Sequence, residues 1–363
     1  MIDIDSAEAR GAASAVSPGS GPVEYTPARQ QKVVRLNRHE PSLSPGAMRV
    51  NLPPLGQLGP LIALLIACVV FSATTDQFLS GENFALILQQ VMVVGVIAIG
   101  QTLIVLTAGI DLSCGMIMAL GGIVMTRFAV ELGLPAPMAI LCGLGATTLF
   151  GLMNGLLVTR IKLPPFIVTL GVYNIAFAAT QLYSSSQTVT DVPPLMVWLG
   201  NTFPVAGANV AYGTVLLLLL YGLTWFWLRE TAAGRHVYAV GNNPEAARLV
   251  GIPPERVLLG VYTLAGLFYG VASLLSVART GVGDPNAGQT ENLDAITAVV
   301  LGGTSLFGGR GAIFGSLIGA VVVGVLRNGL TLMGVSSVYQ VLATGILVIV
   351  AVTVDQLSRR GGR

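Results

Sequence analysis

Polar and ionisable side chains are few in this chain of 363 residues, and many of them stand at short breaks between long apolar stretches. Asp111 and Ser113 occupy one such break, where a carboxylate can either cap a following helix or line a passage for a polar solute. Asn154 and Asn174 lie within apolar stretches, where an amide either bonds across neighbouring helices or contacts a ligand. These groups offer hydrogen bonds rather than covalent chemistry, and their spacing leaves both roles open.

The run 241–251 has the pattern of a short helix with both ends marked. Asn243 is a preferred N-cap residue, Pro244 suits the first helical position, and Gly251 favours termination. The helix is predicted to comprise Asn243, Pro244, Glu245, Ala246, Ala247, Arg248 and Leu249. Its small residues would allow it to enter a groove on a partner protein, and an ordinary connector between two longer helices has the same pattern.

Missing residues exclude several classes of catalyst. A phosphate-binding P-loop needs a lysine after its glycine-rich turn, whereas the only lysines, Lys32 and Lys162, follow no such turn. No HExxH, CxxC or GxSxG pattern is present, so we predict no catalytic residue, no metal site and no cofactor bound by this chain. No ionisable pair lies in the middle of an apolar segment, which argues against proton-coupled transport. A net charge of +2 gives no reason to expect nucleic acid.

Composition indicates which elements must position the polar groups. Hydrophobic residues make up 53% of the chain and charged residues 10%, whereas a soluble domain has roughly 25% charged residues. A lipid bilayer is the expected solvent, and segments that span it must be helical because lipid cannot hydrogen-bond free backbone groups. The expected fold is therefore an all-α polytopic membrane protein. Its ten predicted spans are 55–74, 84–108, 112–130, 136–158, 165–183, 208–228, 257–278, 294–309, 311–330 and 336–354.

Positive side chains predict how these spans are oriented. With ten crossings and the amino terminus inside, sixteen of the nineteen Lys and Arg residues are cytoplasmic, and only Arg127, Arg279 and Arg327 lie outside. If the glycine-interrupted eighth segment were instead re-entrant, the division would be thirteen to six. The positive-inside rule therefore favours ten crossings with both termini in the cytoplasm.

The same pattern divides the chain into parts. We expect a disordered cytoplasmic tail over 1–50, a transmembrane domain over 51–358 with a long cytoplasmic loop at 229–256, and a short cytoplasmic tail over 359–363. A faint internal repeat has an offset of 174 residues, since Asn154-Gly155-Leu156 matches Asn328-Gly329-Leu330 and Gly171 matches Gly345. In the ten-span arrangement spans 2–5 and 7–10 would form an inverted repeat, which is frequent among transporters. Four identities are equally compatible with chance.

Several ordered runs resemble a known family over about residues 55–355. The runs 108–113 (AGIDLS), 154–158 (NGLLV) and 164–171 (PPFIVTLG) are similar to the permease subunits of ribose- and galactose-type ABC sugar importers, which depend on a binding protein. In the second half, 241–248 (GNNPEAAR) and 300–311 (VLGGTSLFGGRG) resemble the same family.

The resemblance implies a permease subunit in the bacterial inner membrane that moves a monosaccharide such as ribose, galactose or xylose by alternating access. It also implies three partners, namely a second permease copy, a cytoplasmic subunit that binds and hydrolyses ATP, and an extracytoplasmic sugar-binding protein. The helix Asn243–Leu249 would be the coupling helix that contacts the ATPase.

For the substrate pathway, hydroxyl and amide groups suit a neutral polyol. The candidates are Asp111, Ser113, Asn154, Asn174, Thr304 and Ser305. A permease of a branched-chain amino acid ABC importer and a standalone secondary carrier remain the alternative functions.

Overall fold

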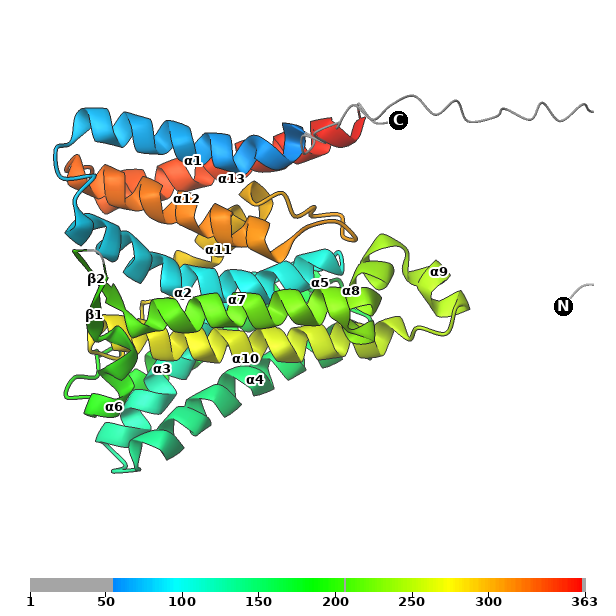
Figure 1. The fold of residues 1–363 in the computed structure, drawn as a ribbon. Helices are drawn as coiled ribbons and strands as arrows, with labels where there is room; N and C mark the ends of the chain where they lie inside the picture. The colour runs from blue at the N-terminus through cyan, green and yellow to red at the C-terminus, as the bar shows by residue number, and fades with distance from the viewer. Residues whose placement is uncertain (1–54, 206, 361–363) are drawn as a thin grey trace, which may run out of the picture. The chain divides into compact units, whose positions relative to one another are not determined.

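The computed structural model describes residues 55–205 and 207–360 (Figure 1). The predicted tail over 1–50 and the last residues, 361–363, lie outside this range. The helices are α1 (Leu55–Thr74), α2 (Gly81–Leu106), α3 (Cys114–Val130), α4 (Ala136–Thr159), α5 (Pro165–Ser184), α6 (Pro194–Val197), η1 (Trp198–Gly200), α7 (Tyr212–Glu230), α8 (Ala232–Asn242), α9 (Pro244–Leu249), α10 (Pro254–Thr280), α11 (Glu291–Leu301), α12 (Ile313–Leu332) and α13 (Ser337–Arg360). Two strands, β1 (Thr202–Val205) and β2 (Ala208–Ala211), complete the described elements.

A helix lies at each of the ten predicted apolar segments. In an apolar environment the backbone N–H and C=O groups must hydrogen-bond to one another, and a helix satisfies them within the segment. Within the described residues, six of these helices are long and apolar enough to cross a membrane: α2, α4, α5, α7, α10 and α12. The eighth predicted span is too long, since α11 ends at Leu301, where Gly302 and Gly303 follow and Gly303 has a φ of +82°. Its 11 residues extend about 16 Å, roughly half of a hydrocarbon layer.

The prediction of an all-helical chain is wrong between α5 and α7. There β1 and β2 form an antiparallel hairpin in which Thr202 pairs with Ala211 and Val205 with Ala208. Residues 208–211 were expected to begin a span, but they pair with β1, so α7 starts at Tyr212. The Tyr212 ring stacks on Trp198 with ring centroids 5.0 Å apart, and this contact holds η1 beside the hairpin.

Helix bounds repeat at the offset that the sequence suggests. Adding 174 to the bounds of α2 gives 255–280, against Pro254–Thr280 for α10. The same shift takes α3 to 288–304, α4 to 310–333 and α5 to 339–358, which are close to the bounds of α11, α12 and α13. The repeat therefore extends over four helices, well beyond the four identical residues.

Glycines allow the closest helix contacts, as the small-residue spacing of these helices permits. A Cβ on Gly151 of α4 would lie 2.9 Å from the Gly266 Cα of α10, and one on Gly319 of α12 would lie 1.9 Å from the Ala298 carbonyl oxygen of α11. Any larger side chain would separate these backbones. The buried helix α2 contacts both α10 and α12, and it thereby connects the pair α4–α10 to the pair α11–α12.

The loops gather at two ends of the helices (Figure 1). One end carries α8 and α9, and we call it the α9 end. The opposite end carries α6, β1 and β2, and we call it the hairpin end. A bridge between Val189 and Gly283 joins the segment after α5 to the α10–α11 connection at the hairpin end.

Candidate functional site

The short helix α9 has the ends that its sequence predicts. The Asn243 side-chain Oδ1 accepts a hydrogen bond of 3.0 Å from the Ala246 N–H, and Pro244 occupies the first turn. The helix stops at Leu249, and Gly251 follows with a φ of +86°. The N-cap, the proline position and the glycine stop are thus confirmed.

One side of α9 is left uncovered in this chain. The Ala247 side chain is buried, whereas Leu249 is 88% exposed and Val250 is 75% exposed. Arg248 pairs with Glu255 at the start of α10 and lies 3.8 Å from Glu245. Two large apolar side chains are therefore exposed side by side at the end of this capped helix.

The glycine-rich loop 302–312 lies against α8 and the end of α2. The Gly309 N–H donates a hydrogen bond of 2.9 Å to the Leu106 carbonyl oxygen, and the Tyr238 hydroxyl donates one of 3.1 Å to the Gly311 carbonyl oxygen. A Cβ on Gly241 would lie 1.7 Å from the same Leu106 oxygen. The loop after α11 is therefore packed beside the segment that carries α9.

Thr304 and Ser305, two of the predicted pathway residues, are buried in this loop. The Thr304 hydroxyl has no hydrogen-bond partner among the described residues and faces Gly311, where a Cβ would lie 2.6 Å from its Oγ1.

Asp111, Ser113 and Asn154 do come together, in a buried cluster between α2, α4 and α10. The Asp111 Oδ1 accepts hydrogen bonds from the Ser113 N–H at 2.8 Å and from the Ser113 hydroxyl, and Oδ2 accepts one of 3.0 Å from the Tyr269 hydroxyl. The Asn154 amide donates to the Ser113 Oγ at 2.9 Å. The Gln101 amide donates to the Asp111 carbonyl oxygen at 3.1 Å.

The cluster corrects and extends the sequence-based interpretation. The N-cap residue of α3 is Ser113 and not Asp111. The Asp111 carboxylate instead accepts a hydrogen bond from the N–H of Ser113, the residue just before the helix begins. Asn174 lies apart from the cluster on an exposed part of α5, where its amide donates to the Leu170 carbonyl oxygen at 3.1 Å. Tyr269 and Gln101 were missed as partners because only the fold brings them to Asp111.

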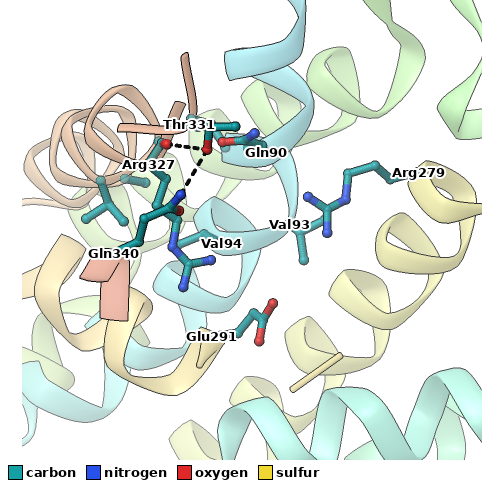
Figure 2. Close-up of a pocket in the computed structure, with 12 residues that line it drawn as sticks. Gln90, Val93, Val94, Arg279, Glu291, Arg327, Thr331 and Gln340 are labelled. Atoms are coloured by element: carbon teal, nitrogen blue, oxygen red, sulfur yellow. Dashed lines mark hydrogen bonds between the residues drawn. The ribbon is translucent and has the colours of Figure 1, made fainter. Parts of the chain in front are cut away.

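A cavity of about 620 Å³, part of it open to the surroundings, lies between α2, α10, α11, α12 and α13 (Figure 2). In Figure 2, Arg279, Glu291 and Arg327 converge on this space from α10, α11 and α12. Its polar lining residues are Gln90, Arg279, Glu291, Arg327, Thr331 and Gln340. None of the six predicted pathway residues lines it.

Arg327 also forms an ion pair beneath the cavity. Its Nη2 lies 2.7 Å from Oδ2 of Asp294, a carboxylate with 0% exposed side chain, and donates a hydrogen bond of 3.0 Å to the Thr290 hydroxyl. Asp294 opens the predicted eighth span and Arg327 lies near the end of the ninth, so neither stood in the middle of a segment. A charged residue inside each of two consecutive apolar segments was the signal that could have identified this pair.

Among the described residues, no group of three or more His, Cys, Asp or Glu side chains could hold a metal ion. The side chains gathered around Asp111 and around the cavity offer hydrogen bonds and charges.

Known proteins match most of this sequence. The family described as "Branched-chain amino acid transport system / permease component" matches residues 83–352. The chain is 45% identical over 307 residues to the fructose import permease protein of Rhizobium meliloti, covering 83% of this chain and 85% of that protein. It is 39% identical over 306 residues to the ribose import permease protein of Bacillus subtilis, covering 83% and 92% of the two chains. The xylose transport system permease protein of Escherichia coli is 31% identical over 375 residues, which cover 87% of this chain and 94% of that protein. The chain therefore belongs to the branched-chain amino acid transport system / permease component family.

Proposed function

We propose that this chain is the membrane permease subunit of an ATP-driven ABC importer and that it moves a monosaccharide across the bacterial inner membrane by alternating access. The observation that carries the proposal is the similarity, over 83% of the chain, to permeases named for fructose and ribose import. Those names, together with that of the xylose permease, favour a sugar over a branched-chain amino acid, although the family description mentions the latter.

Energy for transport comes from a separate cytoplasmic subunit in this proposal. The chain has no lysine placed for a P-loop, so it cannot hold ATP in that way. The helix Asn243–Leu249 serves as the coupling helix, and its exposed Leu249 enters a groove on the ATPase. The ion pair of Arg248 with Glu255 supports the assignment, because it joins α9 to the start of α10.

The membrane topology that fits this function has ten passages, cytoplasmic termini and an inverted repeat of spans 2–5 and 7–10. The α9 end is then cytoplasmic and the hairpin end external. The short α11 completes its passage through loop 302–312, since Gly309 reaches Leu106 and Gly311 reaches Tyr238 beside the cytoplasmic segment. Arg279 and Arg327 then lie near the external side and are two of the three exceptions to the positive-inside rule.

The pathway proposed from the sequence involves Asp111, Ser113, Asn154, Asn174, Thr304 and Ser305. Asp111, Ser113 and Asn154 fit this role best, because they share one buried cluster with Tyr269. Tyr269 lies about 22 Å from the start of α10 along the helix axis, at roughly 1.5 Å per residue. A second permease copy completes the passage, and an extracytoplasmic sugar-binding protein delivers the solute at the hairpin end.

The experiment that tests the function is uptake into proteoliposomes. The chain is reconstituted with its ATP-binding subunit and sugar-binding protein, and uptake of radiolabelled fructose, ribose, xylose and leucine is measured with and without ATP. We expect uptake of at least one sugar that requires ATP and both partners, and none of leucine. Sugar uptake that persists without the partners and follows an ion gradient would instead identify a secondary carrier.

A further inference from the structure

The cavity at the hairpin end presents polar atoms that the described part of the chain does not satisfy. The buried Gln90 Oε1 and Arg327 Nε have no hydrogen-bond partner there, and neither does Asp294 Oδ1 directly behind Arg327. A buried polar atom without a partner costs about 1–3 kcal/mol, so such atoms in native proteins usually meet water or a ligand. Gln90 and Arg327 line the cavity, so a rotation of these two side chains would bring their unpaired atoms to a polar occupant.

The charges around the cavity predict that this occupant is neutral. Arg279 and Arg327 contribute two positive charges, and Glu291 with Asp294 contributes two negative ones, so their sum is zero. An anion would compete with Glu291, and a cation would face both guanidinium groups. A neutral polyhydroxy compound meets neither difficulty, because each hydroxyl group both donates and accepts hydrogen bonds.

The lining of the cavity favours a sugar ring among neutral compounds. The cavity is partly open to its surroundings, so a small solute can enter it. Its planar polar groups, Gln90, Arg279 and Glu291, are suited to pairs of adjacent hydroxyls. Val93 and Val94 of α2 form an apolar wall in Figure 2, against which the C–H face of a ring can pack.

We propose that the cavity lined by Gln90, Arg279, Glu291, Arg327, Thr331 and Gln340 is a binding subsite for a neutral monosaccharide at the external mouth of the pathway. The inference rests on the proposed function and adds a site distinct from the buried cluster around Asp111. Glu291 and Gln90 bind sugar hydroxyls directly, whereas Asp294 positions Arg327.

The first test compares identical substitutions at two carboxylates. In the reconstituted importer, Glu291→Gln is expected to lower ATP-driven sugar uptake by about tenfold, the effect of losing a hydrogen bond to a charged group, without changing ATP hydrolysis in the absence of sugar. Glu131→Gln is the matched control, because Glu131 pairs with Arg127 on the surface of α3 outside the cavity. Uptake equal to wild type in both Glu291→Gln and Gln90→Leu would overturn the proposal.

The second test detects occupancy of the cavity without relying on transport. Thr331→Cys is made in a variant whose native Cys68, Cys114 and Cys142 are replaced by serine, and labelling by a membrane-impermeant maleimide is followed over time. We expect externally added reagent to label Cys at this position, ribose or fructose at millimolar concentration to slow labelling, and leucine to have no effect. Absence of labelling, or equal rates with and without sugar, would contradict the subsite.

The two outcomes separate this inference from the proposed function. If the wild-type importer takes up sugar while the cavity variants behave normally, only the subsite fails. If the wild-type importer takes up no sugar at all, the proposed function fails. Should Glu291→Gln not reach the membrane, protection at position 331 decides the matter.

Discussion

The hydroxyl of Tyr269 on α10 donates a hydrogen bond of 3.0 Å to the Asp111 carboxylate, which lies in the break between α2 and α3. Both side chains are buried. The bond therefore joins the two halves of the repeat of 174 residues, since α10 of the second half corresponds to α2 of the first.

Removal of that donor tests the role of the cluster. Tyr269→Phe leaves Asp111 Oδ2 without its partner, and we expect the free energy of unfolding to fall by about 1–3 kcal/mol. Thermal unfolding of the purified protein in detergent measures the change. Tyr339→Phe is the control, since the Tyr339 side chain is 64% exposed and should lose nothing. Equal unfolding temperatures for Tyr269→Phe and wild type would contradict the prediction.

A glycine contact tests the packing of α8 against α2. Gly241→Ala places a Cβ 1.7 Å from the Leu106 carbonyl oxygen, a backbone atom that cannot rotate away. We expect lower thermal stability and loss of sugar uptake, because α8 must move and α9 follows it in the chain. Gly260→Ala in α10 has nothing within 4 Å of the added Cβ, so it should keep wild-type stability and uptake. If both variants behave alike, the contact does not constrain the fold.

The exposed tip of α9 tests coupling to the ATPase. Leu249→Asp puts a charge on a side chain that is 88% exposed, so folding should be unaffected. The charge should impair docking of α9 into an apolar groove on the ATP-binding subunit. The expected result is normal abundance in the membrane, weakened copurification of the ATP-binding subunit and low uptake. Leu79→Asp is the matched control, because Leu79 is 78% exposed in the turn between α1 and α2 at the hairpin end. Wild-type copurification of Leu249→Asp would argue against a coupling role for α9.

The ion pair beneath the cavity makes a prediction about stability. Asp294→Ala leaves the Arg327 guanidinium without its partner, and we expect a loss of about 3 kcal/mol in the free energy of unfolding. Adding Arg327→Met removes the unpaired charge and should restore part of that stability, but it should not restore sugar uptake. Protein abundance in the membrane and unfolding temperature measure the first effect, and uptake measures the second. A double variant that is no more stable than Asp294→Ala would disprove the pairing argument.

Accessibility of single cysteines tests the proposed topology. In the cysteine-free background, Asn209→Cys in the hairpin and Leu249→Cys at the end of α9 both occupy exposed positions. With an impermeant maleimide we expect the hairpin position to react in intact cells and the α9 position to react only after the membrane is opened. The reverse pattern would invert the orientation, and reaction of both positions in intact cells would place the two loops on the same side.

The local structure of several elements was predictable because nearby residues decide it. Asn243, Pro244 and Gly251 mark the ends of α9 through their own hydrogen bonds and backbone preferences, and the structure confirms them. The bounds of α1 are those expected, since a predominantly apolar segment of this length has few alternatives to a helix. The hairpin was not predicted, because β1 and β2 stabilise each other and neither is marked by its own sequence. The predicted length of α11 was too great, because the end of this helix depends on contacts of the following loop with α2 and α8.

By itself, the sequence determined that the chain belongs in a membrane, where its apolar segments lie, how α9 is capped and which family it resembles. These properties depend on composition and on residues within a few positions of one another. Only the tertiary structure decided that Asp111 meets Tyr269, that Asp294 pairs with Arg327, and that Glu291 and Gln90 face one cavity. Such contacts join residues far apart in the chain, and helix packing fixes them through glycine crossings and buried polar partners that no local pattern specifies.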